Sequence, residues 1–185
     1  MRIIGGDYKG KKLILPNDKK TRPLKDLVKE SIFNLIHHSK KINLDLHNST
    51  ILDLFSGSGS FGLECISRGA KKVTFVEIDG NHLNSIIKNA KNFPYEEFSF
   101  FKRDANRFIK KSDKYDIIFA DPPYSLSIEN YKKLIKLATE NTLNNSDGLF
   151  ILEHFKKVDF SQFDNFFEKR SYGDCSFTFF KQKSG

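Results

Sequence analysis

Short apolar runs alternate with longer amphipathic segments along most of the chain from Thr50 onward. The runs have the length of buried strands, whereas the segments between them repeat apolar side chains at helical spacing. Strands are therefore predicted at 51–54, 72–77, 98–101, 115–120 and 148–153, with helices at 60–68, 80–92, 105–110 and 127–140 between them. This alternation predicts an α/β fold in which helices cover both faces of a parallel sheet and ligands bind beyond the carboxyl ends of the strands.

The two ends of the chain follow other patterns. Residues 3–6 and 12–15 are predicted to form two short strands joined by a turn around Gly10, and residues 24–38 an amphipathic helix after Pro23. Polar residues 39–48 connect this extension to the core. Residues 166–170 and 175–180 flank the turn at 172–174, which predicts an antiparallel pair that closes the sheet.

Length and composition fit a single core. The chain has 185 residues, 38% of them hydrophobic, so we expect one domain over 1–185, with an N-terminal extension at 1–41 and an α/β core at 50–185. The mean hydropathy is −0.48. No apolar run has the length of a membrane span, and the residues after Met1 lack the apolar stretch of a signal peptide. We therefore expect a cytoplasmic protein without a membrane partner. The two cysteines, Cys65 and Cys175, suggest neither a disulfide framework nor a metal site.

Positive charge is concentrated in the N-terminal extension. Residues 1–41 carry eleven Lys or Arg against four acids, a balance of +7, whereas the formal charge of the whole chain is +8. A local basic segment indicates a polyanionic partner, because lysine and arginine contacts to phosphate supply most sequence-independent affinity for nucleic acid. A solvated lysine-rich surface remains the alternative.

A glycine-rich segment, Asp53-Leu-Phe55-Ser-Gly57-Ser-Gly59-Ser-Phe-Gly62, lies where a predicted strand ends and a helix begins. Glycines there let the backbone turn tightly and approach a ligand. Glu77 ends the next strand, 20 residues beyond Gly57, where a carboxylate can accept both hydroxyls of an adenosine ribose. These features indicate an adenosine-containing cofactor, although the glycine spacing also fits a plain tight connection.

Asp53 distinguishes between two such cofactors. A dinucleotide such as NAD places a pyrophosphate at this turn, which a carboxylate would repel. S-adenosylmethionine instead brings an ammonium group, which a carboxylate attracts. The acid therefore favours S-adenosylmethionine.

A second motif, Asp121-Pro122-Pro123-Tyr124, follows the apolar strand predicted at 115–120. A stiff turn is its plain structural reading. At the carboxyl edge of the sheet, however, the Asp121 side chain and the Pro122 carbonyl could accept the two N–H groups of a planar amine and direct its lone pair at a methyl donor. Tyr124 could stack on the base that carries the amine.

The chain resembles the RsmD-like 16S ribosomal RNA guanine-N2 methyltransferases. The resemblance rests on Arg2-Ile-Ile-Gly-Gly, Lys9-Gly-Lys11, Thr21-Arg22-Pro23, Asp26-x-Val28-x-Glu30-Ser-Ile-Phe33-Asn34, the glycine-rich segment, Glu77 and Asp121-Pro-Pro-Tyr124. It implies a Rossmann-like class I methyltransferase fold, with a mostly parallel seven-stranded sheet, a C-terminal antiparallel strand and a small N-terminal β-hairpin plus helix.

The resemblance also implies the reaction and the site. The expected reaction is S-adenosylmethionine-dependent methylation of a guanine N2 amine in 16S ribosomal RNA, by a monomer that needs no metal and acts on the small ribosomal subunit. Three sets of residues are implied: catalytic Asp121, Pro122, Pro123 and Tyr124; cofactor-binding Asp53, Phe55, Gly57, Gly59, Glu77, Ile78, Asp104 and Ala105; and RNA-binding Arg2, Lys9, Lys11, Lys12, Arg22 and Lys25.

Other functions remain open from the sequence. The nearest alternatives are methylation of adenine N6 in DNA or RNA and of a glutamine amide, because each target presents a planar NH2 group. An NAD-dependent oxidoreductase is disfavoured by Asp53, and a non-catalytic RNA-binding protein would need no intact Asp-Pro-Pro-Tyr segment.

Overall fold

The computed structural model describes residues 1–16, 26–42, 44–144 and 147–182. Its strands are β1 (Thr50–Leu54), β2 (Lys72–Glu77), β3 (Phe98–Lys102), β4 (Ile117–Ala120), β5 (Leu149–Phe155), β6 (Phe166–Tyr172) and β7 (Cys175–Lys181). The helical elements are α1 (Asp26–His38), α2 (Ser60–Ser67), α3 (Gly80–Ala90), η1 (Tyr95–Glu97), α4 (Ala105–Ile109), α5 (Ile128–Lys136) and η2 (Leu137–Thr142). No helix in the described ranges is long and apolar enough to cross a membrane.

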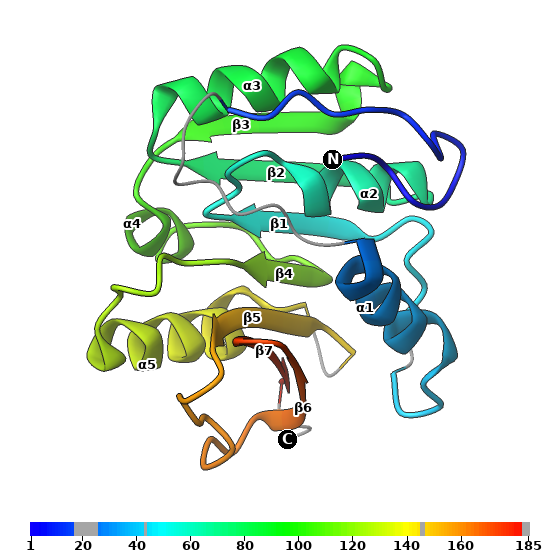
Figure 1. The fold of residues 1–185 in the computed structure, drawn as a ribbon. Helices are drawn as coiled ribbons and strands as arrows, with labels where there is room; N and C mark the ends of the chain where they lie inside the picture. Colours follow the sequence, from blue (N-terminus) through cyan, green and yellow to red (C-terminus); the bar gives the residue numbers. More distant parts are fainter. Residues whose placement is uncertain (17–25, 43, 145–146, 183–185) are drawn as a thin grey trace.

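The strands form one seven-stranded sheet in the order β3-β2-β1-β4-β5-β7-β6 (Figure 1). Strands β1 to β5 pair in parallel, and β7 lies antiparallel to both β5 and β6. Each parallel connection passes through a helical segment, as parallel strands require. The predicted fold, including the antiparallel C-terminal pair, is confirmed.

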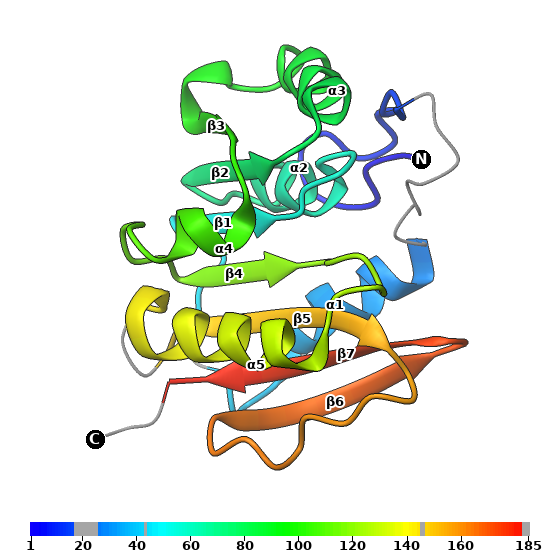
Figure 2. The ribbon, with the colours of Figure 1, turned by 90° about the vertical axis from the view of Figure 1, so that its left-hand side faces the viewer.

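Apolar side chains fill both faces of the sheet. On one face α1, α2 and α3 pack over a cluster that includes Ile51, Phe75 and Phe119. On the other, α4, α5 and η2 pack over a cluster that includes Leu52 and Phe150. Figure 2 views the face with α4 and α5 and shows α1 behind the sheet. Because the core strands are buried on both faces, they are almost continuously apolar rather than alternating.

The N-terminal segment pairs with itself over a short distance. Residues Arg2 and Lys12 form an antiparallel bridge, and Ile3 N donates to Lys11 O over 2.9 Å. The predicted hairpin is thus present, but as a single bridge rather than two regular strands. Gly6 fixes its path, because its φ is 74° and an added Cβ would lie 1.6 Å from the Ser67 carbonyl oxygen of α2.

Glu64 of α2 joins this segment to the core. Its fully buried carboxylate accepts hydrogen bonds from Ile4 N at 2.9 Å and Gly5 N at 2.8 Å. It also accepts from Arg68 Nε at 2.9 Å and forms an ion pair at 3.5 Å with Lys29 of α1, whose side chain is fully buried as well. The basic extension is therefore held by the helix that starts in the glycine-rich segment.

The helix predicted at 127–140 changes its winding before it ends. After Lys136 the chain continues as the π-helical turn η2, in which Leu143 N donates to Ala138 O at 2.9 Å. The Thr142 hydroxyl donates to Leu137 O at 3.1 Å and reaches Ile109 O at 3.3 Å. The wider turn thus joins this helix to the end of α4, a long-range contact that helical periodicity does not encode.

Candidate active site

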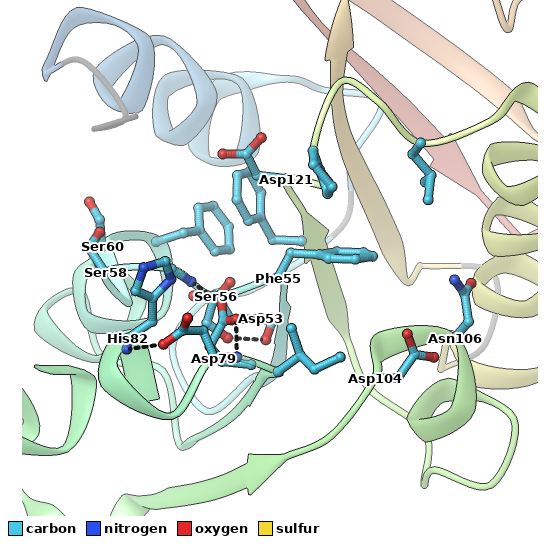
Figure 3. Close-up of a pocket in the computed structure, with 17 residues that line it drawn as sticks. Asp53, Phe55, Ser56, Ser58, Ser60, Asp79, His82, Asp104, Asn106 and Asp121 are labelled. Carbon is cyan, nitrogen blue, oxygen red and sulfur yellow. Dashed lines mark hydrogen bonds between the residues drawn. The ribbon is translucent and has the colours of Figure 1, made fainter. Parts of the chain in front are cut away.

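A cavity of about 500 Å³ lies at the carboxyl edge of the sheet. Its walls come from the ends of β1, β2 and β4, from the segments that follow them, and from the start of α4 (Figure 3). Strand β1 lies between β2 and β4 in the sheet, so the glycine-rich segment after β1 is flanked by Glu77 on one side and Asp121 on the other. This is the edge at which the alternating pattern predicted a ligand.

The turn after β1 has positive φ values, which residues other than glycine rarely adopt. Gly57 and Gly59 have φ values of 53° and 72°, and Phe55 has a φ of 54° despite its Cβ. A bulky residue in the left-handed region is strained by about 1 kcal/mol or more. The Phe55 ring lies along the cavity wall (Figure 3), so the strained position contributes a flat apolar surface to the site.

Ser56 ties this turn to the neighbouring strand. Its hydroxyl donates to Asp53 O at 2.6 Å and accepts from Val76 N at 3.0 Å. Gly62 has a packing role, because an added Cβ would lie 2.5 Å from the Phe75 ring of β2. The helix α2 can therefore pack closely against the sheet and keep the turn in place.

Glu77 closes the turn from β2. Its Oε2 accepts from Gly57 N at 2.8 Å and its Oε1 from Asp79 N at 2.9 Å. A carboxylate offers about four acceptor positions, so two remain for donors in the cavity that Glu77 lines. Two hydroxyl groups of a ribose would match this capacity.

Asp53 is almost fully buried at the base of the cavity, with 1% of its surface exposed. Its Oδ2 accepts from Gly62 N at 3.0 Å. Burial raises the pKa of this carboxyl well above its usual range, a shift that the Gly62 hydrogen bond opposes and that Asp121 and Glu77 increase. A cationic group in the cavity would stabilise its ionised form.

The segment after β4 supplies the other wall. Asp121 and Pro123 line the cavity, whereas Pro122 and Tyr124 do not. Leu126 N donates to Pro123 O at 2.8 Å, which fixes the turn that leads into α5. The Tyr124 ring lies beside Phe155, with ring centroids 5.6 Å apart and planes inclined by 51°.

Two buried polar atoms on the cavity wall have no hydrogen-bond partner among the described residues. They are Ser60 Oγ, at the start of α2, and Asn106 Oδ1, in α4. Figure 3 shows these side chains on opposite sides of the cavity. Because buried polar atoms are nearly always satisfied, these two could contact a bound molecule, the Ser60 hydroxyl as donor or acceptor and Asn106 Oδ1 as acceptor.

The cavity brings together most of the residues predicted to bind the cofactor. Asp53, Phe55, Gly57, Glu77, Ile78 and Asp104 line it, whereas Gly59 and Ala105 do not. Asp104 also caps α4, since its Oδ1 accepts from Arg107 N at 2.9 Å. These positions agree with the predicted roles, and the contacts themselves stay predictions.

Other residues that line the cavity were not predicted from the sequence, among them Ser58, Ser60, Asp79, His82 and Asn106. Asp79 had a recognisable signal, because an aspartate before a helix start is a typical N-cap. Its side chain accepts from Asn81 N at 2.7 Å and His82 N at 3.2 Å. Ser60 and Asn106 had none, since polar residues near helix starts are common.

The predicted RNA-binding residues differ in their surroundings. Lys9 and Lys12 are exposed, and Arg2 pairs with Asp26 at 3.1 Å. Lys11 instead donates to the Asn92 carbonyl and lies over the rings of Tyr8 and Phe93, at 4.7 Å and 4.8 Å. Lys11 therefore fastens the hairpin to the segment that follows α3. Arg22 and Lys25 lie outside the described residues.

Comparison with known proteins identifies the family. A family model described as "Conserved hypothetical protein 95" matches residues 1–181. Ribosomal RNA small subunit methyltransferase D of Haemophilus influenzae is 34% identical over 158 residues, covering 83% of this chain and 78% of that protein. The chain belongs to this family. The resemblance recognised in the sequence is thereby confirmed.

Two further comparisons support this assignment. The Escherichia coli K12 protein of the same name is 31% identical over 154 residues, 83% of this chain and 74% of its own length. A solved Escherichia coli structure, provisionally assigned as a methyltransferase, is 26% identical, with a TM-score of 0.83 over 100% of this chain and 99% of that one. The chain is therefore a methyltransferase with the fold of this family.

The burial of Asp53 gives a testable pH dependence. Because its pKa is raised in the folded state, the folded protein binds more protons than the unfolded chain between the two pKa values, and stability falls as pH rises through that window. Asp53→Asn removes this penalty and keeps an acceptor for Gly62 N. We expect the variant to be more stable than the parent at neutral pH, as measured by urea unfolding.

The same measurement at about pH 4 provides the control, because the unfolded carboxyl is then partly protonated and the difference should shrink. A stability difference that does not change with pH would show that Asp53 is not the titrating group.

Proposed function

We propose that this methyltransferase transfers a methyl group from S-adenosylmethionine to the N2 amine of a guanine in 16S ribosomal RNA of the small subunit. The observation that carries the proposal is that Glu77 and Gly57 line the same cavity as Asp121 and Pro123. The shared family with proteins named ribosomal RNA small subunit methyltransferase D supports the substrate class.

The residues of the cavity fit S-adenosylmethionine. Glu77 has acceptor capacity for the ribose hydroxyls, and the buried Asp53 suits the ammonium of the methionine end. Ser60 Oγ and Asn106 Oδ1 are further buried polar atoms that could form hydrogen bonds with the cofactor. When bound, the cofactor supplies an electrophilic methyl group on a sulfonium.

The segment after β4 prepares the amine. The N2 lone pair of guanine is delocalised into the ring, so the amine is a poor nucleophile. The Asp121 carboxylate and the Pro122 carbonyl accept its N–H groups, hold the nitrogen in the orientation for attack, and stabilise the positive charge that develops on it. The two prolines limit the backbone freedom of that carbonyl.

The test is transfer of labelled methyl from S-adenosylmethionine to small ribosomal subunits that lack guanine-N2 methylation, followed by nucleoside analysis. N2-methylguanosine in 16S ribosomal RNA is the expected product. N6-methyladenosine would replace the target base, methylation of a protein amide would replace the substrate class, and no transfer to any of them would contradict the proposal.

A further prediction concerns the basic extension. Changing both Lys9 and Lys12, which are exposed, to glutamine should reduce the slope of log affinity for small subunits against log salt by about 1 to 2, because each lost phosphate contact contributes about 0.9. Lys132→Gln with Lys133→Gln, an exposed pair on α5, is the matched control. Equal slopes for both double variants would show that Lys9 and Lys12 do not contact the phosphates of the RNA.

A further inference from the structure

An aromatic pair lies immediately outside the cavity. Tyr124 directly follows Pro123, which lines the cavity. The centroid of the Tyr124 ring lies 5.6 Å from the centroid of the Phe155 ring. Phe155 is the last residue of β5 and is half-buried. Part of Phe155 is therefore accessible beside the segment proposed to hold the amine.

Strand register explains why these distant residues meet. Ala120, the last residue of β4, pairs with Leu152 of β5 in the parallel ladder. Strand β5 therefore extends beyond the end of β4, and its final residue lies alongside the Asp121–Tyr124 segment. Figure 2 shows β4 and β5 ending at the same edge of the sheet.

The backbone that carries Phe155 is fixed on both sides. The ring of His154 is buried, with Nε2 2.7 Å from Thr178 Oγ1 and Nδ1 3.0 Å from Phe155 O. Lys156 N donates to Asp174 O at 2.9 Å. Preorganised aromatic rings bind with little loss of conformational entropy, so this position is well suited to contact a ligand.

Positive charge accompanies the rings. Lys157 Nζ lies 5.9 Å from the centroid of the Phe155 ring, and both Lys156 and Lys157 are exposed. Aromatic side chains beside lysines are typical of proteins that bind single-stranded nucleic acid, because the rings stack on bases while the cations contact phosphates.

Resting on the proposed function, we propose that Phe155 and Tyr124 form a stacking surface for an unpaired RNA base at the mouth of the cavity, with Lys157 contacting the adjoining phosphate. A guanine can enter the cavity only when it is unstacked from its neighbours. Stacking on Phe155 and Tyr124 replaces part of the base stacking that the RNA loses when the guanine is unstacked. Phe155 is thus a substrate-binding residue from an element that the Asp-Pro-Pro-Tyr motif does not contain.

The test compares three variants of the full chain: Phe155→Leu, which keeps an apolar side chain without the planar ring, Phe155→Tyr, which keeps the ring, and Phe167→Leu. Phe167 is the matched control, because it is also half-buried and has a lysine, Lys181, 5.0 Å from its ring centroid. It lies at the opposite end of the sheet, where Lys181 pairs with the first residue of β5.

Phe155→Leu should raise the KM for unmethylated small subunits about tenfold, since one base stacked on an aromatic ring contributes about that much or more. We expect kcat, affinity for S-adenosylhomocysteine and the unfolding temperature to remain close to those of the parent. Phe155→Tyr and Phe167→Leu should both behave as the parent does.

Equal KM values for Phe155→Leu and Phe167→Leu would overturn the inference while leaving the proposed function intact, provided the parent methylates the subunits. If the parent methylates no RNA, the proposed function fails by itself. Anisotropy of fluorescein-labelled oligoadenylate then still tests the stacking surface: weaker binding of Phe155→Leu alone supports it, and equal or absent binding rejects it.

Discussion

Replacement of Asp121 by alanine is expected to lower kcat for methyl transfer about 100- to 1,000-fold, the usual cost of removing one preorganised group that stabilises developing charge. Asp121 lines the cavity directly after β4, where its carboxylate can orient an amine. The affinity for S-adenosylhomocysteine, measured by calorimetry, should change little, because the proposed cofactor contacts come from β1, β2 and α4.

Asp121→Asn is the matched variant, because it keeps the shape and one acceptor oxygen but removes the charge. Its kcat should fall between those of the parent and of Asp121→Ala. If Asp121→Ala loses turnover and cofactor affinity together, the aspartate would have a role in cofactor binding or folding rather than in holding the amine.

Replacement of Glu64 by alanine is expected to lower the free energy of unfolding by about 3–5 kcal/mol, the range found when one partner of a buried ion pair is removed. The carboxylate is the acceptor for Ile4 N and Gly5 N and the partner of the fully buried Lys29. Its loss leaves the N-terminal segment without its anchor and Lys29 without its closest buried counter-charge. Chemical unfolding at neutral pH measures the effect.

Glu140→Ala provides the control, because Glu140 forms an exposed pair with Lys136 at 4.0 Å and should change stability by at most about 0.5 kcal/mol. Adding Lys29→Met to Glu64→Ala should recover part of the loss, since both charges are then absent. No recovery would mean that the lost hydrogen bonds, rather than the unpaired cation, account for the destabilisation.

The pH dependence of Glu64→Ala follows from the buried lysine. Burial lowers the pKa of Lys29, and Glu64 is the main opposing influence. Without Glu64 the folded protein binds fewer protons at Lys29 than the unfolded chain does over a wider range, so stability should rise with pH through that range. The deficit of the variant should therefore become smaller under alkaline conditions.

The sequence predicted the elements of the sheet well because each core strand is short, apolar and followed by an amphipathic helix. The strand at 72–77 has the predicted bounds, and most other ends differ by one to three residues. The larger differences have tertiary causes. The helix predicted at 127–140 ends as a π-helical turn because the Thr142 hydroxyl reaches the end of α4.

Sequence patterns indicated the position of the cavity best where backbone conformation restricts the residue type, and the roles of its residues stay predictions. Gly57 and Gly59 have positive φ values, and Glu77 is the last residue of a strand that the hydrophobic pattern predicted with the same bounds. Lys11 illustrates the limit. Its charge suggested a phosphate contact, but in the folded chain it donates to the Asn92 carbonyl, a partner 81 residues away that no local pattern reveals.

By itself, the sequence determined the fold class, the carboxyl edge as the place of the site, and the Asp53, Glu77 and Asp121 carboxylates that face the same cavity. These follow from hydrophobic periodicity and from motifs at strand ends, which are local properties of the chain. Only the tertiary structure decided that Glu64 and Lys29 form a buried pair, that Lys11 is held by the segment after α3, and that Phe155 meets Tyr124. Those contacts depend on strand register and on helix packing, and both are set by interactions between residues far apart in the sequence.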